Sequence, residues 1–447
     1  MKRNILLVIC LLAGICLGRA FEVNGIHYTI IDGEAVVINE NLENKIDKIE
    51  YWGTTSNLPY PCVSTYKGNI VIPATVDYEG NTYQVTGIAQ GAFCGAQETI
   101  SLTIPEGIKH IGHSAFYGNK GFKTLEFPKS VERIGIYACV LMYGLERVVL
   151  PEKLDTIPMG MFQMPSPGGT SPTLEEVVMP KSCKVIGENA FQGNTKLETL
   201  TLPDDLVEIQ AGAFSLCKKL KTALPASVKN VGRQAFYFVP SPTNQVLSEN
   251  ILLEPSSFAY AKGWVNVCIP EHITTIPDHC FDACTNIETL EFSSAMDTIG
   301  DHSFHGAKKL RVIILPESLK YMGGGAFSRC ENLRTVYARM KTPPSLKDRE
   351  FGSEDAYPQN PDDAVVYVPV GCKEAYKQAG WDKFFAEIIE MSETEQKAAF
   401  DEIATGISTV KAGAKARAES WYDLQGRQVT RPEKGRIYIH DGRKVAE

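Results

Sequence analysis

Histidine, aspartate and cysteine are the residues whose types and spacing could support chemistry in this chain of 447 residues. The pair Asp278-His279 returns 23 positions later as Asp301-His302. If these pairs lay on neighbouring turns of a repeating fold, they would be about 5 Å apart and could bind a metal ion or respond to pH. A solvated pair on a bend is the alternative interpretation. His302 and His305 also flank one aromatic residue, but the H-E-x-x-H pattern of zinc hydrolases is absent.

The cysteines follow a simpler pattern. Cys217, Cys284 and Cys330 each stand three residues after a phenylalanine, so one position of a repeat accounts for all three. We therefore expect buried thiols that act as small apolar side chains. Cys280 and Cys284 are close enough in sequence to approach each other, but the paired C-x-x-C motifs of a zinc site are absent.

Other signatures of catalysis are missing from the sequence. It contains no nucleophile elbow, phosphate-binding loop, dinucleotide fingerprint or kinase motif set. The sequence therefore predicts no enzymatic activity, no cofactor and no metal, with a hydrolase of cryptic site as a remote alternative. A net charge of −8 and a pI of about 5.7 argue against a nucleic-acid partner.

The elements that must position these residues belong to an internal repeat. The stretch Ile111-Gly112-His113-Ser114-Ala115-Phe116 returns as Ile186-Gly187-Glu188-Asn189-Ala190-Phe191, and looser copies follow. The repeat advances by 22 or 23 residues, with one step of 29 before Phe191. Its index positions are Phe93, Phe116, Cys139, Phe162, Phe191, Phe214, Phe236, Phe258, Phe281, Phe304 and Phe327. This regular register predicts a solenoid, which ends where the register stops after Phe327.

Each unit has the pattern of a short strand, a turn and a bend. Residues 197–202 alternate apolar and polar side chains, as a half-buried strand does, and Pro203 ends the strand. The glycine of the Ile-Gly pair suits a tight bend with positive φ. The alanine and phenylalanine that follow would fill the centre of the coil. A single unit cannot bury such a ring, so coils must stack, at about 4.8 Å per coil.

The rest of the chain divides by composition. A basic start, an apolar run and a small-x-small end are typical of an export signal, and no later segment is long and apolar enough to span a membrane. Turn pairs such as Asp32-Gly33 between apolar runs predict a β cap, which a solenoid needs at its open end. The predicted segments are the signal peptide 1–20, the N-terminal β cap 21–87, the solenoid 88–340, a C-terminal capping coil 341–390 with a short helix within 372–385, a linker 391–420, and a small module of three strands in 421–447. Pro-rich insertions at 164–172 and 240–243 predict surface loops.

The repeat pattern L-x-x-L-x-I-P-x-x-V-x-x-I-G-x-x-A-F-x-x-C resembles the BspA-type leucine-rich repeat, over residues 88 to about 340. The resemblance implies a mainly β protein, a right-handed parallel β-solenoid with coils of 22–23 residues and no long helices. It also implies a surface-exposed interaction role in anaerobic bacteria. Residues 421–447 resemble the C-terminal sorting module of type IX secretion substrates, through the L-x-G-x-x-V spacing that begins at Leu424 and the Y-I-x-x-G-x-x-V spacing that begins at Tyr438, with Gly435 upstream.

Outward-facing strand positions provide the candidate binding face. Alternation places two columns of side chains on the outside of the coils. One column is Thr103, Glu126, Val149, Val178, Thr201, Glu291, Ile314 and Tyr337, and the other is Thr124, Arg147, Glu176, Thr199, Thr289, Val312 and Thr335. The β-propensity of threonine and valine explains much of this composition, but apolar residues in an exposed row suggest a covered patch. The candidate face comprises Glu126, Arg147, Val149, Val178, Ile314 and Tyr337.

These patterns predict an exported protein that binds rather than catalyses. We expect it at the cell surface or outside the cell, associated with the outer membrane of a Gram-negative bacterium, and monomeric. Its expected partners are proteins or glycans of host or neighbouring cells, bound in an adhesion-type interaction by a rigid, repeated face. A structural scaffold or spacer in a surface assembly is the alternative, and its deletion should dissolve a complex rather than abolish attachment.

Overall fold

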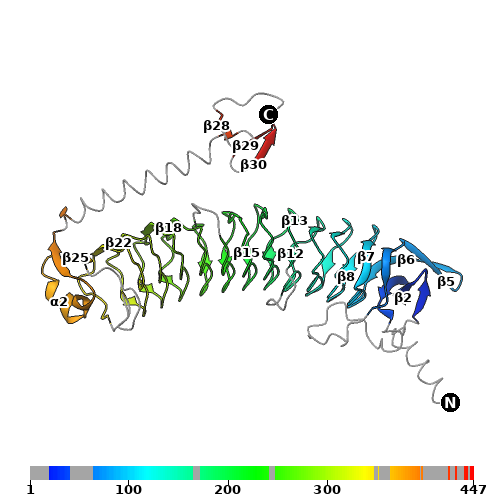
Figure 1. Cartoon of the computed structure of the whole chain (residues 1–447), viewed down its shortest axis with the longest axis horizontal. Coiled ribbons are helices and arrows are strands. Elements are labelled where there is room, and N and C mark those ends of the chain that lie inside the picture. The colour runs from blue at the N-terminus through cyan, green and yellow to red at the C-terminus, as the bar shows by residue number, and fades with distance from the viewer. Residues whose placement is uncertain are drawn as a thin grey trace, which may run out of the picture.

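The computed structural model describes residues 20–40, 64–164, 172–240, 247–346, 351, 363–392 and 394–395, and the backbone of four strands within 421–446. The described coils stack into a long, gently arched body with the N-terminal strands at one end and helix α2 (Lys373–Gln378) near the other (Figure 1). The described part is mainly β, as predicted, and its parallel strands fit the predicted solenoid.

Two rows of strands run along this stack. The first row, called the strand face, turns alternate side chains to solvent. It consists of β4 (Lys67–Val71), β7 (Glu98–Thr103), β9 (Thr124–Glu126), β11 (Arg147–Val149), β13 (Glu176–Val178), β18 (Asn266–Cys268), β20 (Thr289–Glu291), β22 (Val312–Leu315), β24 (Thr335–Ala338), β25 (Val365–Pro369) and β26 (Glu387–Met391). The strands that pair within this row in the described part of the chain do so in parallel.

The second row is made of shorter strands that follow the Pro-containing turn of each coil. Its strands are β6 (Asn81–Ile88), β8 (His110–Ile111), β10 (Arg133–Ile134), β12 (Thr156–Ile157), β14 (Val185–Ile186), β15 (Glu208–Ile209), β16 (Asn230–Val231), β17 (Leu252–Leu253), β19 (Thr275–Ile276), β21 (Thr298–Ile299) and β23 (Tyr321–Met322). Parallel partners lie one coil apart, as in Glu208 with Asn230. The insertion before Phe191 is absorbed between β11 and β13, where Arg147 still pairs with Glu176.

The core holds a file of aromatic rings inside the coils, interrupted at Cys139. From Phe162 to Phe351, successive rings stack with centroids 5.4 to 5.7 Å apart. Phe258 is fully buried in this file, which confirms its index position, and Cys139 occupies the aromatic position as a buried thiol. The register was predicted to stop after Phe327, and this was wrong. Phe351, 24 residues after Phe327, adds one further ring with its centroid 5.7 Å from that of Phe327, because an interval one residue longer than the repeat still carries the chain once around the coil.

The glycine of the Ile-Gly pair is needed for a different reason from the one its sequence suggests. Gly112 is not among the residues with positive φ; the left-handed residue is Ser114, two positions later, with φ of 51°. A Cβ added at Gly112 would lie 2.3 Å from the backbone nitrogen of Gln90 in the preceding coil. The expectation of a left-handed glycine was therefore wrong. Glycine occupies this position because the backbones of adjacent coils approach too closely for any side chain.

The N-terminal cap merges into the stack. It adds β1 (Phe21–Val23), β2 (Ile26–Ile31), β3 (Glu34–Ile38) and β5 (Thr75–Tyr78). Strands β2 and β3 pair antiparallel around Asp32-Gly33, which confirms the predicted hairpin. Strand β3 then pairs in parallel with β6, and β6 with β8, so β6 is both the last strand of the cap and the first rung of the second row. This arrangement covers the core edge that the first coil would otherwise expose.

The far end is closed by the segment around α2 and the 3-10 turn η2 (Trp381–Lys383). The hydroxyl of Tyr376 donates to the carbonyl oxygen of Met340 at 2.8 Å, and the indole of Trp381 donates to that of Pro344 at 3.0 Å. The short helix expected within residues 372–385 is present as α2. Its Tyr376 and the Trp381 of η2 bind carbonyl groups of the last coil.

The C-terminal module has four strands instead of the expected three. These are β27 (Trp421–Tyr422), β28 (Gln428–Val429), β29 (Ile437–His440) and β30 (Arg443–Ala446), in the order β28-β27-β29-β30. The last segment folds back on itself, because β29 and β30 pair antiparallel as a hairpin.

Several predicted segments lie outside the described residues. They are nearly all of the signal peptide 1–20, most of the linker 391–420, and most of the insertions at 164–172 and 240–243. In the part of the chain that the structure describes, no helix has the length and apolar character needed to cross a membrane.

Candidate binding surfaces

The six predicted binding residues form two separate patches on the strand face. Glu126, Arg147, Val149 and Val178 lie on β9, β11 and β13, whereas the other two lie on β22 and β24. Val178 and Ile314 belong to coils six steps apart, or about 29 Å at 4.8 Å per coil. The structure thus does not bring all six residues into one site.

The N-terminal patch is dominated by an ion-pair ladder. Arg147 reaches Glu126 at 3.0 Å through its Nη1 atom and Glu176 at 3.1 Å through its Nε atom. These three residues come from successive parallel strands; Arg147 is in register with Glu176, and it reaches Glu126 diagonally, because its register partner on β9 is Thr124. Arg147 offsets one of the two glutamate charges, and exposed pairs of this kind contribute little to stability. Val178, beside the ladder, is 38% exposed.

The C-terminal patch is apolar and aromatic. Ile314 pairs in register with Tyr337, Tyr337 with Tyr367, and Tyr367 with Ile389, on β22, β24, β25 and β26. The rings of Tyr337 and Tyr367 stack with centroids 5.0 Å apart and planes 18° apart. All four side chains are partly exposed. They form one column across four adjacent strands, which we call the tyrosine column.

Sequence reasoning found Ile314 and Tyr337 but missed Tyr367 and Ile389. The alternation of residues 365–368 shows an outward tyrosine, and this was the available signal. No spacing rule could align it with Tyr337, because the interval of 30 residues differs from the repeat period. Only the parallel pairing of β24 with β25 places the two rings together.

A polar depression lies near the N-terminal ends of β20 and β22, the second of which carries the first residue of the tyrosine column. Its volume is about 430 Å³, and it is lined by Glu288, Thr289, Lys309, Arg311 and Asn332. Lys309 pairs with Glu288 at 3.3 Å. Two basic residues and one acidic residue line the depression, so it favours an anionic group. Arg311 directly precedes Val312, the first residue of β22.

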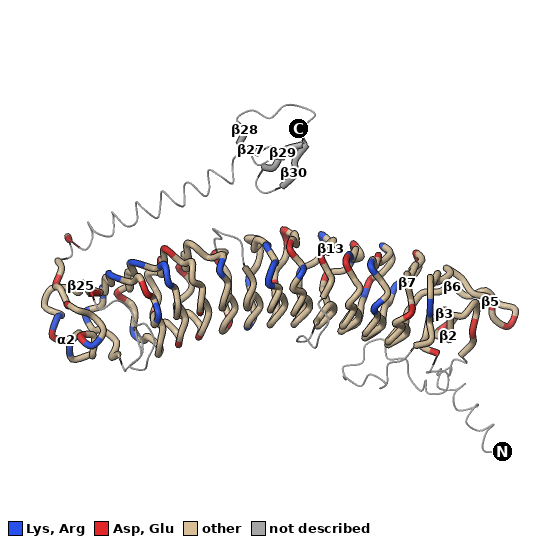
Figure 2. The backbone as a smooth tube through the Cα atoms, viewed as in Figure 1, with Lys and Arg blue, Asp and Glu red and all other residues tan. Residues whose placement is uncertain are grey.

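Charges elsewhere on the coils are mixed in sign. Lysines and arginines alternate with acidic residues along the whole stack (Figure 2). Many pairs join one coil to the next, such as Lys221 with Glu198 at 2.8 Å and Lys184 with Asp205 at 2.9 Å. This pattern produces no large field of one sign that would steer a charged polymer.

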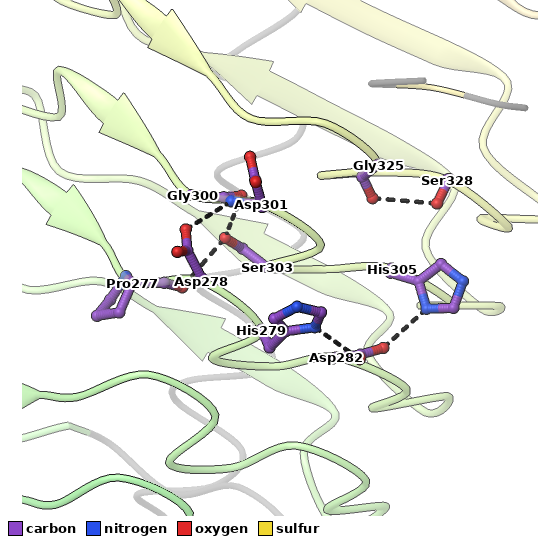
Figure 3. A network of polar contacts seen from close by, with 10 residues as sticks. All are labelled: Pro277, Asp278, His279, Asp282, Gly300, Asp301, Ser303, His305, Gly325 and Ser328. Atoms are coloured by element: carbon purple, nitrogen blue, oxygen red, sulfur yellow. Dashed lines mark hydrogen bonds and ion pairs between the residues drawn. The ribbon is translucent and has the colours of Figure 1, made fainter. Parts of the chain in front are cut away.

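The bends carry a network of histidine and aspartate. His279 and His302 stack on neighbouring coils with ring centroids 4.9 Å apart and planes 5° apart. Figure 3 shows that Asp282 lies between His279 and His305, with Oδ2 3.1 Å from Nδ1 of His279 and Oδ1 2.7 Å from Nδ1 of His305. Asp282 was missed from the sequence because it stands directly after the index aromatic, at a position that carries no fixed residue type.

The surroundings of this network shift the pKa values of Asp282 and His302. Burial raises the pKa of Asp282, but hydrogen bonds from His305 and His279 outweigh this effect and hold the pKa below its usual value. Burial, followed by the nearby charges of His279 and His305, lowers the pKa of His302. At neutral pH Asp282 is therefore an anion and His302 a neutral ring.

Asp278 and Asp301, the aspartates considered for a site with His279 and His302, have another role. Oδ1 of Asp278 accepts a hydrogen bond from the backbone N–H of Asp301 at 2.8 Å, and Oδ1 of Asp301 accepts one from that of Gly324 at 2.9 Å. Each aspartate therefore caps a backbone donor of the next coil. Among the described residues, no group of three histidine, cysteine, aspartate or glutamate side chains is arranged to hold a metal ion.

The repeat-position cysteines are buried, as predicted. The thiols of Cys217, Cys284 and Cys330 lie 3.1, 3.2 and 3.5 Å from the carbonyl oxygen of the phenylalanine in the preceding coil, to which they donate. Burial raises the pKa of Cys217 and of Cys330 to about 12. Cys280 and Cys284 are both free, and Cys94 is disulfide-bonded.

Parallel coils around a single file of aromatic rings define this molecule as a leucine-rich-repeat type of β-solenoid. The family model of the BspA type leucine rich repeat region matches residues 80–166, 170–260 and 247–351, in six copies. The matches cover more than half of the chain, so the chain belongs to the BspA-type leucine-rich repeat family. Members of this family are typically cell-surface binding proteins without enzymatic activity.

Solved leucine-rich repeat structures resemble the chain at low identity. A leucine-rich repeat protein from Bacteroides ovatus is 20% identical, with 71% of this chain and 94% of that chain covered and a TM-score of 0.43. A leucine rich cell surface protein from Faecalibacterium prausnitzii is 18% identical, with 85% and 97% covered and a TM-score of 0.43. The pneumococcal vaccine antigen PcpA is 18% identical, with 84% and 99% covered and a TM-score of 0.41. No curated protein matches the chain.

Proposed function

We propose that this protein is an exported surface protein that binds a protein or glycan of host or neighbouring cells in an adhesion-type interaction. In this proposal the solenoid is right-handed with 22–23-residue coils, the chain is monomeric, and it associates with the outer membrane of a Gram-negative bacterium. Residues 1–20 act as the export signal and residues 421–447 as the sorting module.

The tyrosine column is the observation that carries this proposal. Tyr337 and Tyr367 form a stacked, partly exposed aromatic pair, continued by Ile314 and Ile389 on the flanking strands. Tyrosine is favoured at interfaces because it offers a large apolar ring with a polar end. Parallel pairing holds the column rigid, so little side-chain entropy is lost on binding.

The neighbouring depression limits which chemical groups a partner can place there. Lys309 and Arg311 line it beside the first strand of the column. A protein segment that places an acidic side chain there and apolar side chains on the tyrosines would satisfy both features. A glycan with an acidic substituent is the other ligand that this combination suits.

The experiment compares capture of partners by the wild-type protein and by a Tyr337→Ala/Tyr367→Ala double variant. Partners captured from intact host cells are identified and then titrated, as purified molecules, against both proteins. We expect the double variant to weaken binding by at least about tenfold, equivalent to about 1.4 kcal/mol. Tyr321→Ala is the matched control, because Tyr321 is an exposed tyrosine on β23, in the second row.

Equal binding by wild type and double variant would refute the role of the tyrosine column. The scaffold alternative predicts a different outcome: deletion of the protein would release other components from a surface complex while attachment to host cells stays unchanged.

A further inference from the structure

The bends of five successive coils present a surface distinct from the strand face. Within each coil, the residues one and two positions after the index aromatic stack on the equivalent residues of the next coil. Backbone bonds maintain this order: Tyr260 N–H donates to the carbonyl of Asp282 at 2.6 Å, and Ala283 N–H to that of His305 at 2.7 Å. The bend surface comprises Tyr237, Phe238, Tyr260, Asp282, His305 and Arg329, with Ala283 and Gly306 between them.

One end of the bend surface is an aromatic cluster. Phe238 and Tyr260 stack with centroids 4.2 Å apart and planes 14° apart, and Tyr237 meets both rings edge-on at 4.8 and 5.4 Å. The Phe238 side chain is 37% exposed, and the backbone at this residue is left-handed, with φ of 58°. The cluster is outside the core, so the packing of the coil does not require three large rings at these positions.

The residues that follow Phe238 and Tyr260 in the same column have small side chains. Ala283 and Gly306 hold the equivalent positions in the next two coils, and Arg329 holds the position after them. Burial is the main cause of the raised pKa of Tyr260, and the charges of Asp282 and Arg329 also act on its hydroxyl group. Tyr260, Asp282 and Arg329 therefore lie around the two coils of Ala283 and Gly306, which carry almost no side chain in this column.

The polar groups at this border have defined hydrogen-bonding roles. Asp282 is ionised, so its oxygens can only accept, and Nδ1–H of His305 must donate to it. With Nδ1 of His305 bonded to Asp282, its Nε2 atom is left for another partner, whereas Arg329 provides only donors. Side-chain exposure of 23% at His305 and 12% at Asp282 leaves both groups reachable from solvent.

We propose that the bend surface is a carbohydrate-binding subsite. A sugar ring lies over Ala283 and Gly306 with its C–H face against the ring of Tyr260, and its hydroxyl groups bond to Asp282, His305 and Arg329. Sugar hydroxyl groups both donate and accept, so they match this mixed set of groups. The spacing between coils, about 4.8 Å, is close to the length of one hexose unit, so successive sugars of a short chain would meet successive coils.

The size of the surface argues for a sugar rather than a protein. Five coils span about 19 Å along the solenoid axis, and the surface is only a few side chains wide. A stable protein interface needs about 800 Å² on each partner. A short oligosaccharide fits such a strip. This subsite lies on a different part of the coil from the tyrosine column and does not depend on it.

The test is binding of the full chain to an array of short neutral and sialylated oligosaccharides, followed by saturation-transfer NMR on the sugar that binds. We expect Tyr260→Ala to weaken that binding about tenfold. Asp282→Asn, which keeps the side-chain size, should weaken it too. Tyr321→Ala, an exposed tyrosine outside the bend surface, is the control and should bind like wild type.

Melting curves of each variant separate loss of a contact from loss of fold. The proposal is overturned if no oligosaccharide binds, or if Tyr260→Ala and Tyr321→Ala behave alike. It is also overturned if Tyr260→Ala removes capture of a protein instead of a sugar. The Tyr337→Ala/Tyr367→Ala variant should retain sugar binding, so failure of this subsite and failure of the tyrosine column give different results.

Discussion

Oδ1 of Asp282 lies 2.7 Å from Nδ1 of His305, which belongs to the next coil of the solenoid. This contact joins two coils through a side chain that is only 12% exposed. Charge-assisted bonds of this kind contribute more than neutral ones. We expect Asp282→Asn to lower the free energy of unfolding by about 1 to 3 kcal/mol, measured by urea denaturation. An unchanged unfolding midpoint would show that the contact is not maintained in solution.

Acidification should destabilise the protein in two stages. The folded-state pKa of His302 is below its usual 6.5, so the folded state binds this proton less well than the unfolded state, and stability is lost as pH falls from 6.5 through that lowered value. The pKa of Asp282 is also lowered, so its contribution is present above 3.8 and is lost as pH falls below that value. Melting temperature against pH measures both stages. His302→Gln should reduce the first stage and leave the second, and an identical profile for this variant would contradict the assignment.

Phe191→Ala should be strongly destabilising. The ring is fully buried and stacks on Phe162 and Phe214 at 5.4 Å on each side. Its removal leaves a cavity in a file that cannot close without moving whole coils, so we expect a loss of about 3 to 5 kcal/mol. Thermal and chemical unfolding measure this loss. Val178→Ala, a truncation at a 38% exposed position, is the control and should cost much less. Equal effects of the two changes would refute the inward placement of the ring.

Gly112→Ala should be destabilising even though the glycine has an ordinary backbone conformation. The new Cβ would lie 2.3 Å from the nitrogen of Gln90 and would force two coils apart. We expect a cost of about 1 to 3 kcal/mol, as for other overpacked sites. Gly324→Ala is the matched control, because nothing lies within 4 Å of its added Cβ. A similar melting temperature for the two variants would disprove the close approach of the coils.

Cysteine labelling should distinguish buried from accessible thiols. Cys217 and Cys330 are fully buried with pKa values raised to about 12, so they should resist iodoacetamide in the folded protein. Cys268 and Cys372 are partly exposed and should react first. Mass spectrometry of labelled peptides measures the order. Rapid labelling of Cys217 at native pH would contradict the packing of its coil.

The repeat made much of the fold predictable from local spacing. A phenylalanine at constant intervals must point the same way in every coil, so the file of rings followed from the register alone, including Phe258 and the substitution at Cys139. The burial of the thiol at Cys217 followed in the same way. Features outside the register did not follow. Phe351 extends the file although its spacing departs from the period, and the interval before Tyr367 hides its pairing with Tyr337.

The sequence by itself determined the coil and which positions face inward, because these depend on periodicity along one chain. The tertiary structure decided what meets across coils. It showed that Gly112 serves close packing rather than a left-handed turn, that Asp282 rather than Asp278 binds the histidines, and that the candidate face divides into an ion-pair ladder and a tyrosine column. Contacts between coils depend on the direction of each side chain and on how strands pair across an insertion. The spacing of residues within one coil gives neither of these.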